Sequence, residues 1–354
     1  MSNKLMNPKS KIETFQQLSA ADKRRQVTDL LFNNAMYILI ALAVIVITCI
    51  NPRFIKLPSI INIISLTAAK LPIALGVAGC IVLTGTDISA GRVVGLTACI
   101  SASLLLTANK LFPGLAVMPL PVALLAAVAV GAVIGLVNGF CVAKFKLHPF
   151  IVTLSTQLIT YGVILLYMQM GTNGGQTLSG MSQDYLDFIK GALFYIGGNA
   201  VPKYVLYSAV LTVIMWVIWN KTTFGKNMFA VGSNEEAANV SGVNVMKTII
   251  LVFVLAGVMY GLTGFIDAAR IASVNANTGL NYESDAIAAC VIGGVSFVGG
   301  IGKISGVVVG VLLLQIIFAG LNFLSVDANL LYIVKGLIIL VACAIDMRKY
   351  LVRK

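Results

Sequence analysis

The sequence predicts an all-α polytopic membrane protein with about ten transmembrane helices. The 354-residue chain is 58% hydrophobic and 11% charged, whereas soluble domains carry about 25% charged residues. Two long stretches, 115–143 and 149–183, contain no Asp, Glu, Lys or Arg. A helix of ~20 apolar residues crosses a bilayer. A transmembrane barrel would instead show alternating segments of ~10 residues, and the sequence has no such alternation.

We expect the membrane domain to cover residues 31–347. The predicted spans, in chain order, are 31–50, 60–83, 88–108, 117–143, 149–170, 201–220, 248–268, 284–302, 304–324 and 330–347. The eighth span is the least regular, because Gly293-Gly294 and Gly299-Gly300 can break it into half-helices.

Basic residues predict the orientation of the spans. The net charge is +12, and Lys and Arg collect in cytoplasmic loops. Lys23-Arg24-Arg25 precede the first span, and Arg348, Lys349, Arg353 and Lys354 follow the last. We therefore expect cytoplasmic tails at 1–30 and 348–354, a cytoplasmic loop at 221–247 and an external loop at 171–200. Eight spans would satisfy the same charge pattern.

Small residues recur four positions apart in several spans, and such rows let helix backbones approach closely in a membrane. We expect helix packing at these positions: Gly131, Gly135, Gly139; Gly257, Gly261; Gly302, Gly306, Gly310.

The stretch LTGTDISAGRVVG, residues 83–95, interrupts the apolar pattern with Asp87 and Arg92. One interpretation is an interfacial turn in which Asp87 caps the third span. The other is a helix break beside a translocation path, as in transporters with discontinuous helices. Six polar side chains are candidates to line such a path, although each also suits a packing hydrogen bond between helices: Asp87, Ser89, Asn138, Thr153, Gln157 and Asn322.

A second polar cluster comprises Asp267, Arg270, Glu283 and Asp285. Asp267 and Arg270 have the spacing of an ion pair on one helix face. The four residues suit the external mouth of the bundle. Alternatively, Glu283 and Asp285 form a docking surface for an external partner.

The sequence lacks the residue patterns that metal binding, nucleotide binding and catalysis require. The six cysteines form no CxxC pair, and His148 is the only histidine, so we expect no metal site. GGIGKIS at 299–305 has Ile304 where a nucleotide-binding loop requires Ser or Thr. No Ser/His/Asp set occurs, and the basic residues lie at span ends. We therefore expect neither an enzyme, nor a cofactor on this chain, nor nucleic-acid binding.

Residues 229–247, FAVGSNEEAANVSGVNVMK, predict a short polar helix between two spans. Ser233 suits its N-cap, with Glu236 completing a capping box, and Gly242 suits its end. A helix of two turns is not stable alone. It either lies on its own bundle or on lipid, or it docks into a groove of a separate cytoplasmic protein.

The motif EAANVSG (236–242) resembles the EAA…G signature of ABC-importer permeases, without the later Ile-x-Leu-Pro part. Three stretches resemble the ribose/galactose branch of bacterial sugar permeases: ALGVAGCIVLTGTDISAGRVVGL (74–96), FGKNMFAVGSNEEAANVSGVNV (224–245) and YESDAIAACVIGGVSFVGGIGKISGVVVGV (282–311). GTDISAGR is similar to the galactose/methyl-galactoside type. The resemblance covers about residues 50–350.

The resemblance implies a type II-like importer permease in the bacterial inner membrane. It implies a homodimer that works with a cytoplasmic ATPase, which holds ATP and Mg, and a periplasmic or lipid-anchored sugar-binding protein. The ATPase-coupling residues would be Ser233, Glu235, Glu236, Ala237, Ala238 and Gly242. The alternatives are a ribose or nucleoside importer, or an ion-coupled secondary transporter using Asp87.

Overall fold

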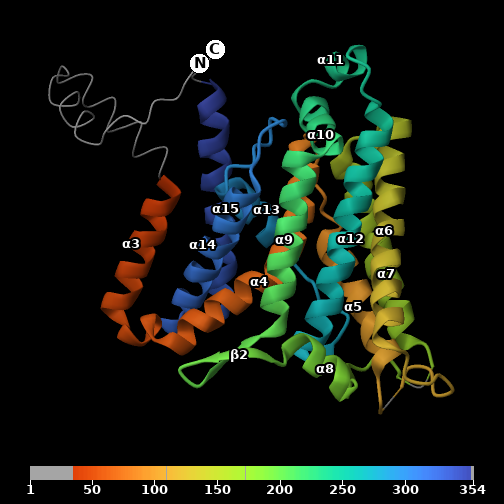
Figure 1. Cartoon of the computed structure of the whole chain (residues 1–354), viewed down its shortest axis with the longest axis vertical. Helices are drawn as coiled ribbons and strands as arrows, with labels where there is room; N and C mark the ends of the chain where they lie inside the picture. The colour runs from red at the N-terminus through yellow and green to blue at the C-terminus, as the bar shows by residue number, and fades with distance from the viewer. Residues whose placement is uncertain (1–34, 109, 172, 352–354) are drawn as a thin grey trace.

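The computed structural model describes residues 35–108, 110–171 and 173–351, which form a helical bundle (Figure 1). The predicted tail 1–30 lies outside the described residues, as do residues 352–354 of the predicted C-terminal tail. The helices are α3 (Ala35–Ile50), η1 (Pro52–Ile55), α4 (Leu57–Val82), α5 (Ala90–Leu105), α6 (Leu120–Phe145), α7 (Pro149–Gln169), α8 (Gln183–Lys190), α9 (Lys203–Lys221), α10 (Thr223–Ser233), α11 (Glu235–Val240), α12 (Val245–Ile271), α13 (Tyr282–Ile292), α14 (Ile304–Phe323) and α15 (Ala328–Leu351). The strands are β1 (Leu178–Ser179), β2 (Ala192–Ile196), β3 (Asn199–Pro202) and β4 (Ser273–Val274).

Helix α12 occupies the centre of the bundle and packs against α4, α5 and α6. Two of the predicted rows of small residues lie at the contact between α6 and α12; in the third, Gly302 falls in the loop before α14, and Gly306 and Gly310 pack against the end of α13. A Cβ atom on Gly131 would overlap the carbonyl oxygen of Gly257, and one on Gly135 would overlap that of Phe253. Gly310 of α14 lies equally close to the Ala289 carbonyl of α13. Backbone approach of this kind replaces the hydrophobic drive that lipid does not supply.

Six helices in the described part of the chain are long and apolar enough to cross a membrane, and α5 is a shorter apolar helix. These six are α4, α6, α7, α9, α12 and α14.

The structure corrects the eighth predicted span. A helix lies in each predicted range, but α13 ends at Ile292, not near residue 302, and residues 293–303 form a loop. Gly294, Gly299 and Gly300 adopt positive φ angles there, a conformation that glycine reaches without steric cost. The half-helix alternative therefore describes this segment.

The two ends of the bundle carry different elements. Helices α10 and α11 lie at one end, and α8 with the β2–β3 hairpin lies at the other (Figure 1). Helix α3 begins, and α15 ends, on the side of α11.

The predicted external loop 171–200 is largely folded. Strand β1 pairs antiparallel with β4, Leu178 opposite Val274. Tyr185 of α8 is fully buried, with its ring centroid 4.9 Å from that of Phe265 in α12. These contacts fasten the segment to the end of α12.

Candidate coupling and translocation site

Helices α10 and α11 are separated by Asn234, whose extended backbone (φ −162°) ends one helix and begins the next. Its side-chain oxygen accepts a hydrogen bond from the Ala237 N–H at 2.8 Å, so Asn234 is the N-cap of α11. Ser233 is the last residue of α10, and its hydroxyl donates to the Phe229 carbonyl at 2.9 Å. The predicted capping box of Ser233 and Glu236 is therefore wrong, because the cap lies one residue later.

Helix α11 protrudes from the end of the bundle (Figure 1). Val240 is 90% exposed, and Glu235 and Glu236 are exposed in the first turn, where carboxylates suit the positive end of the helix dipole. Ala238 faces inward and is 4% exposed. Gly242 ends the segment with φ +84°, as predicted. The inner face thus anchors the helix, and the outer face is exposed.

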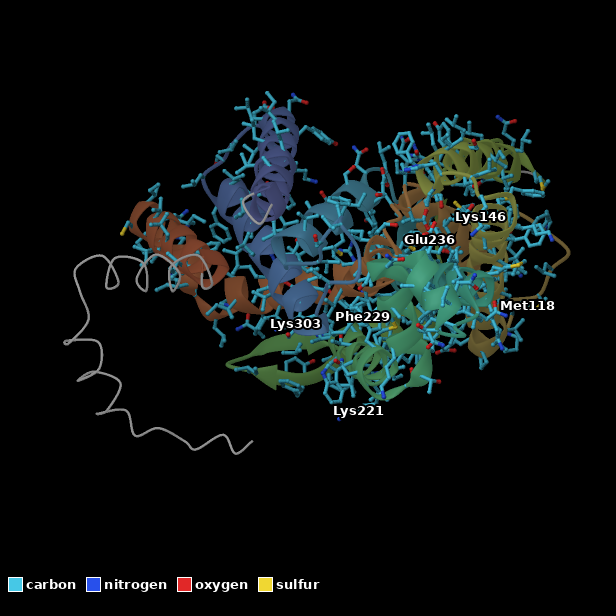
Figure 2. All side chains as sticks on the ribbon, turned by 90° about the horizontal axis from the view of Figure 1, so that it is seen from above. Met118, Lys146, Lys221, Phe229, Glu236 and Lys303 are labelled. Atoms are coloured by element: carbon cyan, nitrogen blue, oxygen red, sulfur yellow. The ribbon has the colours of Figure 1, made fainter. Side chains whose placement is uncertain are left out.

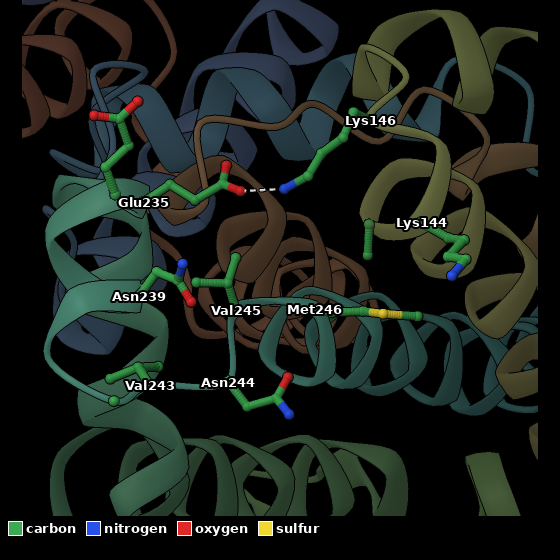
Figure 3. A pocket seen from close by; sticks show the side chains of 11 residues that line it. Lys144, Lys146, Glu235, Asn239, Val243, Asn244, Val245 and Met246 are labelled. Atoms are coloured by element: carbon green, nitrogen blue, oxygen red, sulfur yellow. Dashed lines mark hydrogen bonds and ion pairs between the residues drawn. The ribbon is translucent and has the colours of Figure 1, made fainter.

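An open groove runs beside α11, between the end of α6 and the start of α12 (Figure 3). Its volume is about 630 Å³. Lys146, at the left-handed C-cap of α6, forms an ion pair with Glu235 across the groove. Lys146 and Glu236 both line this groove, and Figure 2 labels them together with the basic residues Lys221 and Lys303. The groove is lined by Ala143, Lys144, Lys146, Glu235, Glu236, Asn239, Gly242, Val243, Asn244, Val245 and Met246.

The last turn of α10 lies against two helix breaks, the end of α4 and the loop 293–303. A Cβ atom on Gly232 would overlap the carbonyl oxygen of Val82, which also accepts the Gly300 N–H at 2.8 Å. A Cβ atom on Gly300 would in turn overlap the hydroxyl of Ser233. Because no space separates these backbones, a displacement of α10 must move both breaks.

The break after α4 carries a buried polar network. Asp87 accepts hydrogen bonds from the Ser89 N–H (2.9 Å) and hydroxyl (2.6 Å). The Asn138 amide donates to the Ser89 hydroxyl (3.1 Å), and the Asn138 carbonyl oxygen accepts from Thr156 (2.6 Å). Asp87 is 1% exposed, so it is not at a solvated boundary. It stabilises the turn ahead of α5 inside the bundle, but the N-cap of α5 is Ser89 and no side chain caps the helix. The interpretation of Asp87 as an interfacial helix cap is therefore wrong.

Thr153 holds the same break from α7. Its hydroxyl accepts the Ile88 N–H at 3.2 Å and lies 3.1 Å from the Thr86 carbonyl, to which it donates. Four of the six predicted path residues, Asp87, Ser89, Asn138 and Thr153, are thus brought together by α5, α6 and α7.

Gln157 and Asn322 are not part of this network. Gln157 lies on α7 and Asn322 in the last turn of α14. Sequence reasoning missed Thr156 and the buried Tyr260, whose hydroxyl lies near Asp87. Thr156 follows Thr153 by three residues, so it shares that face of α7, a signal that the sequence contained.

The second polar cluster is a charge network inside the bundle. Asp267 and Arg270 form the predicted ion pair at 2.6 Å, and Asp267 is fully buried. Asp285 pairs with Lys335 of α15 at 2.9 Å. Lys70 of α4 lies 2.6 Å from the ring centroid of Tyr282. The network joins α4, α12, α13 and α15. Asp267 and Asp285 each form an ion pair, and Lys70 makes a cation–π contact, as suits charged groups buried in a membrane.

Glu283, in the first turn of α13, and Arg92 of α5 lie where α5 contacts the start of α13 and the segment before it. The Glu283 side chain lies where a Cβ atom of Gly91 would be, and Glu283 is 6% exposed. Arg92 donates to the Ala276 carbonyl at 3.1 Å and lies over the Tyr161 ring at 4.1 Å. Glu283 is therefore too buried to form much of the docking surface that the sequence suggested for an external partner. Asp285 is already in an ion pair with Lys335 of α15.

In the described residues, no group of three or more His, Cys, Asp or Glu side chains is arranged to hold a metal ion.

Comparison with known proteins identifies relatives along most of the chain. The family described as "Branched-chain amino acid transport system / permease component" matches residues 59–343. The galactose/methyl galactoside import permease protein MglC of Haemophilus influenzae is 43% identical over 95% of this chain and 100% of its own length. MglC of Escherichia coli is also 43% identical, over the same shares of both chains.

The ribose import permease protein RbsC of Haemophilus influenzae is 32% identical over 91% of this chain and 95% of its own length. No solved structure is significantly similar. These relatives are membrane permease subunits and not enzymes. Because the family match covers more than half of the residues, the chain belongs to the family of transport-system permease components.

Proposed function

We propose that the chain is the transmembrane subunit of an ATP-driven importer of galactose or a galactoside. Its ten helices α3, α4, α5, α6, α7, α9, α12, α13, α14 and α15 would each cross or enter the bilayer, with both termini on the cytoplasmic side. The support is the up-and-down course of the chain, which puts the start of α3 and the end of α15 on one side.

The observation that carries the proposal is the protruding, capped helix α11, whose base is packed against the helix breaks of the bundle. Its exposed outer face would insert into a cytoplasmic ATPase, which binds ATP and Mg on its own chain. Movement of α11 would be transmitted through Gly232 to the end of α4 and to the loop 293–303, because the backbone at Gly232 is in direct contact with both. No chemistry on this chain is needed to use the energy of ATP.

The buried network of Asp87, Ser89, Asn138 and Thr153 lies directly at the first of these breaks. Its hydrogen-bonding groups are the polar side chains that α10 would displace first. We assign to it the cytoplasmic half of the translocation path, where hydroxyl and amide groups suit a sugar. A homodimer in the bacterial inner membrane, fed by a periplasmic or lipid-anchored sugar-binding protein, completes the transporter.

A charge reversal at α11 tests the coupling role. We expect Glu236→Lys to abolish sugar uptake by vesicles that contain the complete complex, while the chain remains inserted. Asp184→Lys, on the exposed surface of α8 at the opposite end, is the matched control and should keep uptake. Normal uptake and ATPase assembly in Glu236→Lys would refute the coupling role.

Competition with unlabelled sugars tests the substrate. The proposal of galactose rests on GTDISAGR and on the 43% identity to MglC. Labelled galactose or methyl galactoside should be imported and should compete with each other. Import of ribose alone would assign the chain to the substrate of the RbsC relatives instead.

A further inference from the structure

The β2–β3 hairpin is an apolar ribbon with little cover from the rest of the protein. Gly197 and Gly198 form its two-residue tip with positive φ angles of 52° and 78°, as a tight hairpin turn requires. An isolated two-stranded ribbon is marginally stable in water. Four consecutive side chains of β2 are nevertheless exposed: Leu193 38%, Phe194 49%, Tyr195 69% and Ile196 43%.

The hairpin lies at the level where apolar helices begin. Strand β3 ends at Pro202, and α9 begins at the next residue, Lys203. The tip glycine Gly197 lies beside Leu57, the first residue of α4. Figures 1 and 2 both show the ribbon projecting sideways from the bundle, and Figure 1 shows it at the end opposite α11. It therefore runs along the plane in which a membrane surrounding the bundle would have its surface.

The two faces of the ribbon differ in a way that suits a lipid interface. Phe194 pairs with Val201 and Ile196 with Asn199, so Phe194 and Ile196 share the face on which Val201 is buried (6% exposed). Tyr195 lies on the opposite face. One face thus presents Phe194, Ile196 and Val201, together with Asn199, whose amide donates to the Gly197 carbonyl at 3.1 Å. The other face presents the Tyr195 ring with its polar hydroxyl.

The surroundings of the hairpin have the composition of a membrane boundary. Residues 192–202 contain no charged residue. Arg53 and Lys56, both exposed in and beside η1, supply positive charge for lipid phosphates next to the tip contact at Leu57. The apolar surface continues from β3 into α9, which exposes Leu206, Val210 and Val213. Aromatic and basic side chains in this arrangement anchor proteins at bilayer surfaces.

We infer that the hairpin 192–202 is an interfacial anchor, which lies at the boundary between the phospholipid headgroups and the acyl chains of the leaflet opposite α11. Phe194 and Ile196 contact acyl chains, Tyr195 faces the headgroups, and Arg53 and Lys56 bind lipid phosphate. A docking protein would cover only one face of the ribbon, whereas β2 exposes Phe194 and Ile196 on one face and the Tyr195 ring on the other. Phospholipid surrounds both faces at once.

Photocrosslinking in the full chain tests this inference. p-Benzoylphenylalanine replaces Phe194 in one variant and Ile196 in another, and each is reconstituted in vesicles of phosphatidylethanolamine and phosphatidylglycerol. After irradiation we expect both variants to gain the mass of one phospholipid on the hairpin peptide. The same probe at Val240, which is apolar and exposed on α11, is the control and should give no lipid adduct.

Two results would overturn the inference. Adducts to a second copy of the chain, or to a sugar-binding protein added outside the vesicles, would assign the hairpin to protein docking. Absence of a lipid adduct at both hairpin positions would place the ribbon in water. If phosphate contacts hold it, Lys56→Gln should reduce the share of adducts formed with anionic phosphatidylglycerol. This readout is independent of uptake, so it is unaffected by the outcome at Glu236.

Discussion

Replacement of Gly232 by alanine is the sharpest test of how α10 is joined to the bundle. The added Cβ atom would overlap the Val82 carbonyl oxygen and would lie 2.9 Å from the Gly300 nitrogen. Overpacking of this kind costs about 1–3 kcal/mol. The Gly300–Val82 hydrogen bond, 2.8 Å long, would also be strained, at a net cost of about 1 kcal/mol.

Alanine also gains about 0.5–1 kcal/mol over glycine inside a helix. The net expectation for Gly232→Ala is therefore a loss of about 1–3 kcal/mol in the free energy of unfolding. Because the strain falls on the contact between α10 and the two breaks, sugar transported per ATP hydrolysed should fall as well. Thermal unfolding of the purified complex and the ratio of uptake to hydrolysis in vesicles measure the two effects.

Gly162→Ala is the matched control, since Gly162 lies within α7 and no atom comes within 4 Å of the added Cβ. It should leave both measurements unchanged or slightly raise the unfolding temperature. If Gly232→Ala matched the wild type in both thermal stability and the ratio of uptake to ATP hydrolysis, α10 would have room for a side chain at this contact. The steric argument for transmission through Gly232 would then fail.

Three further substitutions follow from the polar contacts. Asp267→Asn leaves Arg270 without its buried counter-charge, and we expect a loss of about 3–5 kcal/mol in thermal or denaturant unfolding; a loss below 1 kcal/mol would contradict this. Asn138→Leu removes hydrogen bonds with the buried Ser89 hydroxyl and the half-buried Thr156 hydroxyl, so it should cost about 1–3 kcal/mol and lower uptake; unchanged transport kinetics would disprove this. Lys146→Ala and Glu235→Ala, combined in a double-mutant cycle, should show a coupling energy below about 1 kcal/mol because the pair is exposed; a larger value would show that the groove shields the ion pair from water.

Much of the helical layout was predictable from sequence, because apolar runs and glycine rows are local signals. The row Gly131, Gly135, Gly139 lies against α12 as such a row should. The hairpin and the β1–β4 pairing were not predicted. Leu178 and Val274 are far apart in sequence, and no local pattern specifies which of many apolar residues will pair.

The sequence predicted which residues belong to the candidate site better than it predicted how they are arranged. The cap was misplaced by one residue because Ser233 and Asn234 are both capping residues, and the spacing to Glu236 favoured the wrong one. Glu283 was predicted at an external mouth, but it is buried, because Gly91 leaves the space that its carboxylate occupies. A contact between α5 and the first turn of α13 cannot be predicted from either segment alone.

The charge network inside the bundle has a consequence for biosynthesis. Lys70 sits midway along α4, and the groups that compensate it, Tyr282, Asp267 and Asp285, are synthesised roughly 200 residues later, at about 5–20 residues per second. A lysine at the centre of an inserted helix costs roughly 2.5–3.5 kcal/mol. For on the order of ten seconds or more the nascent α4 therefore carries an uncompensated cation in the bilayer. A chain that ended before α12 would keep this lysine without Asp267, Tyr282 and Asp285.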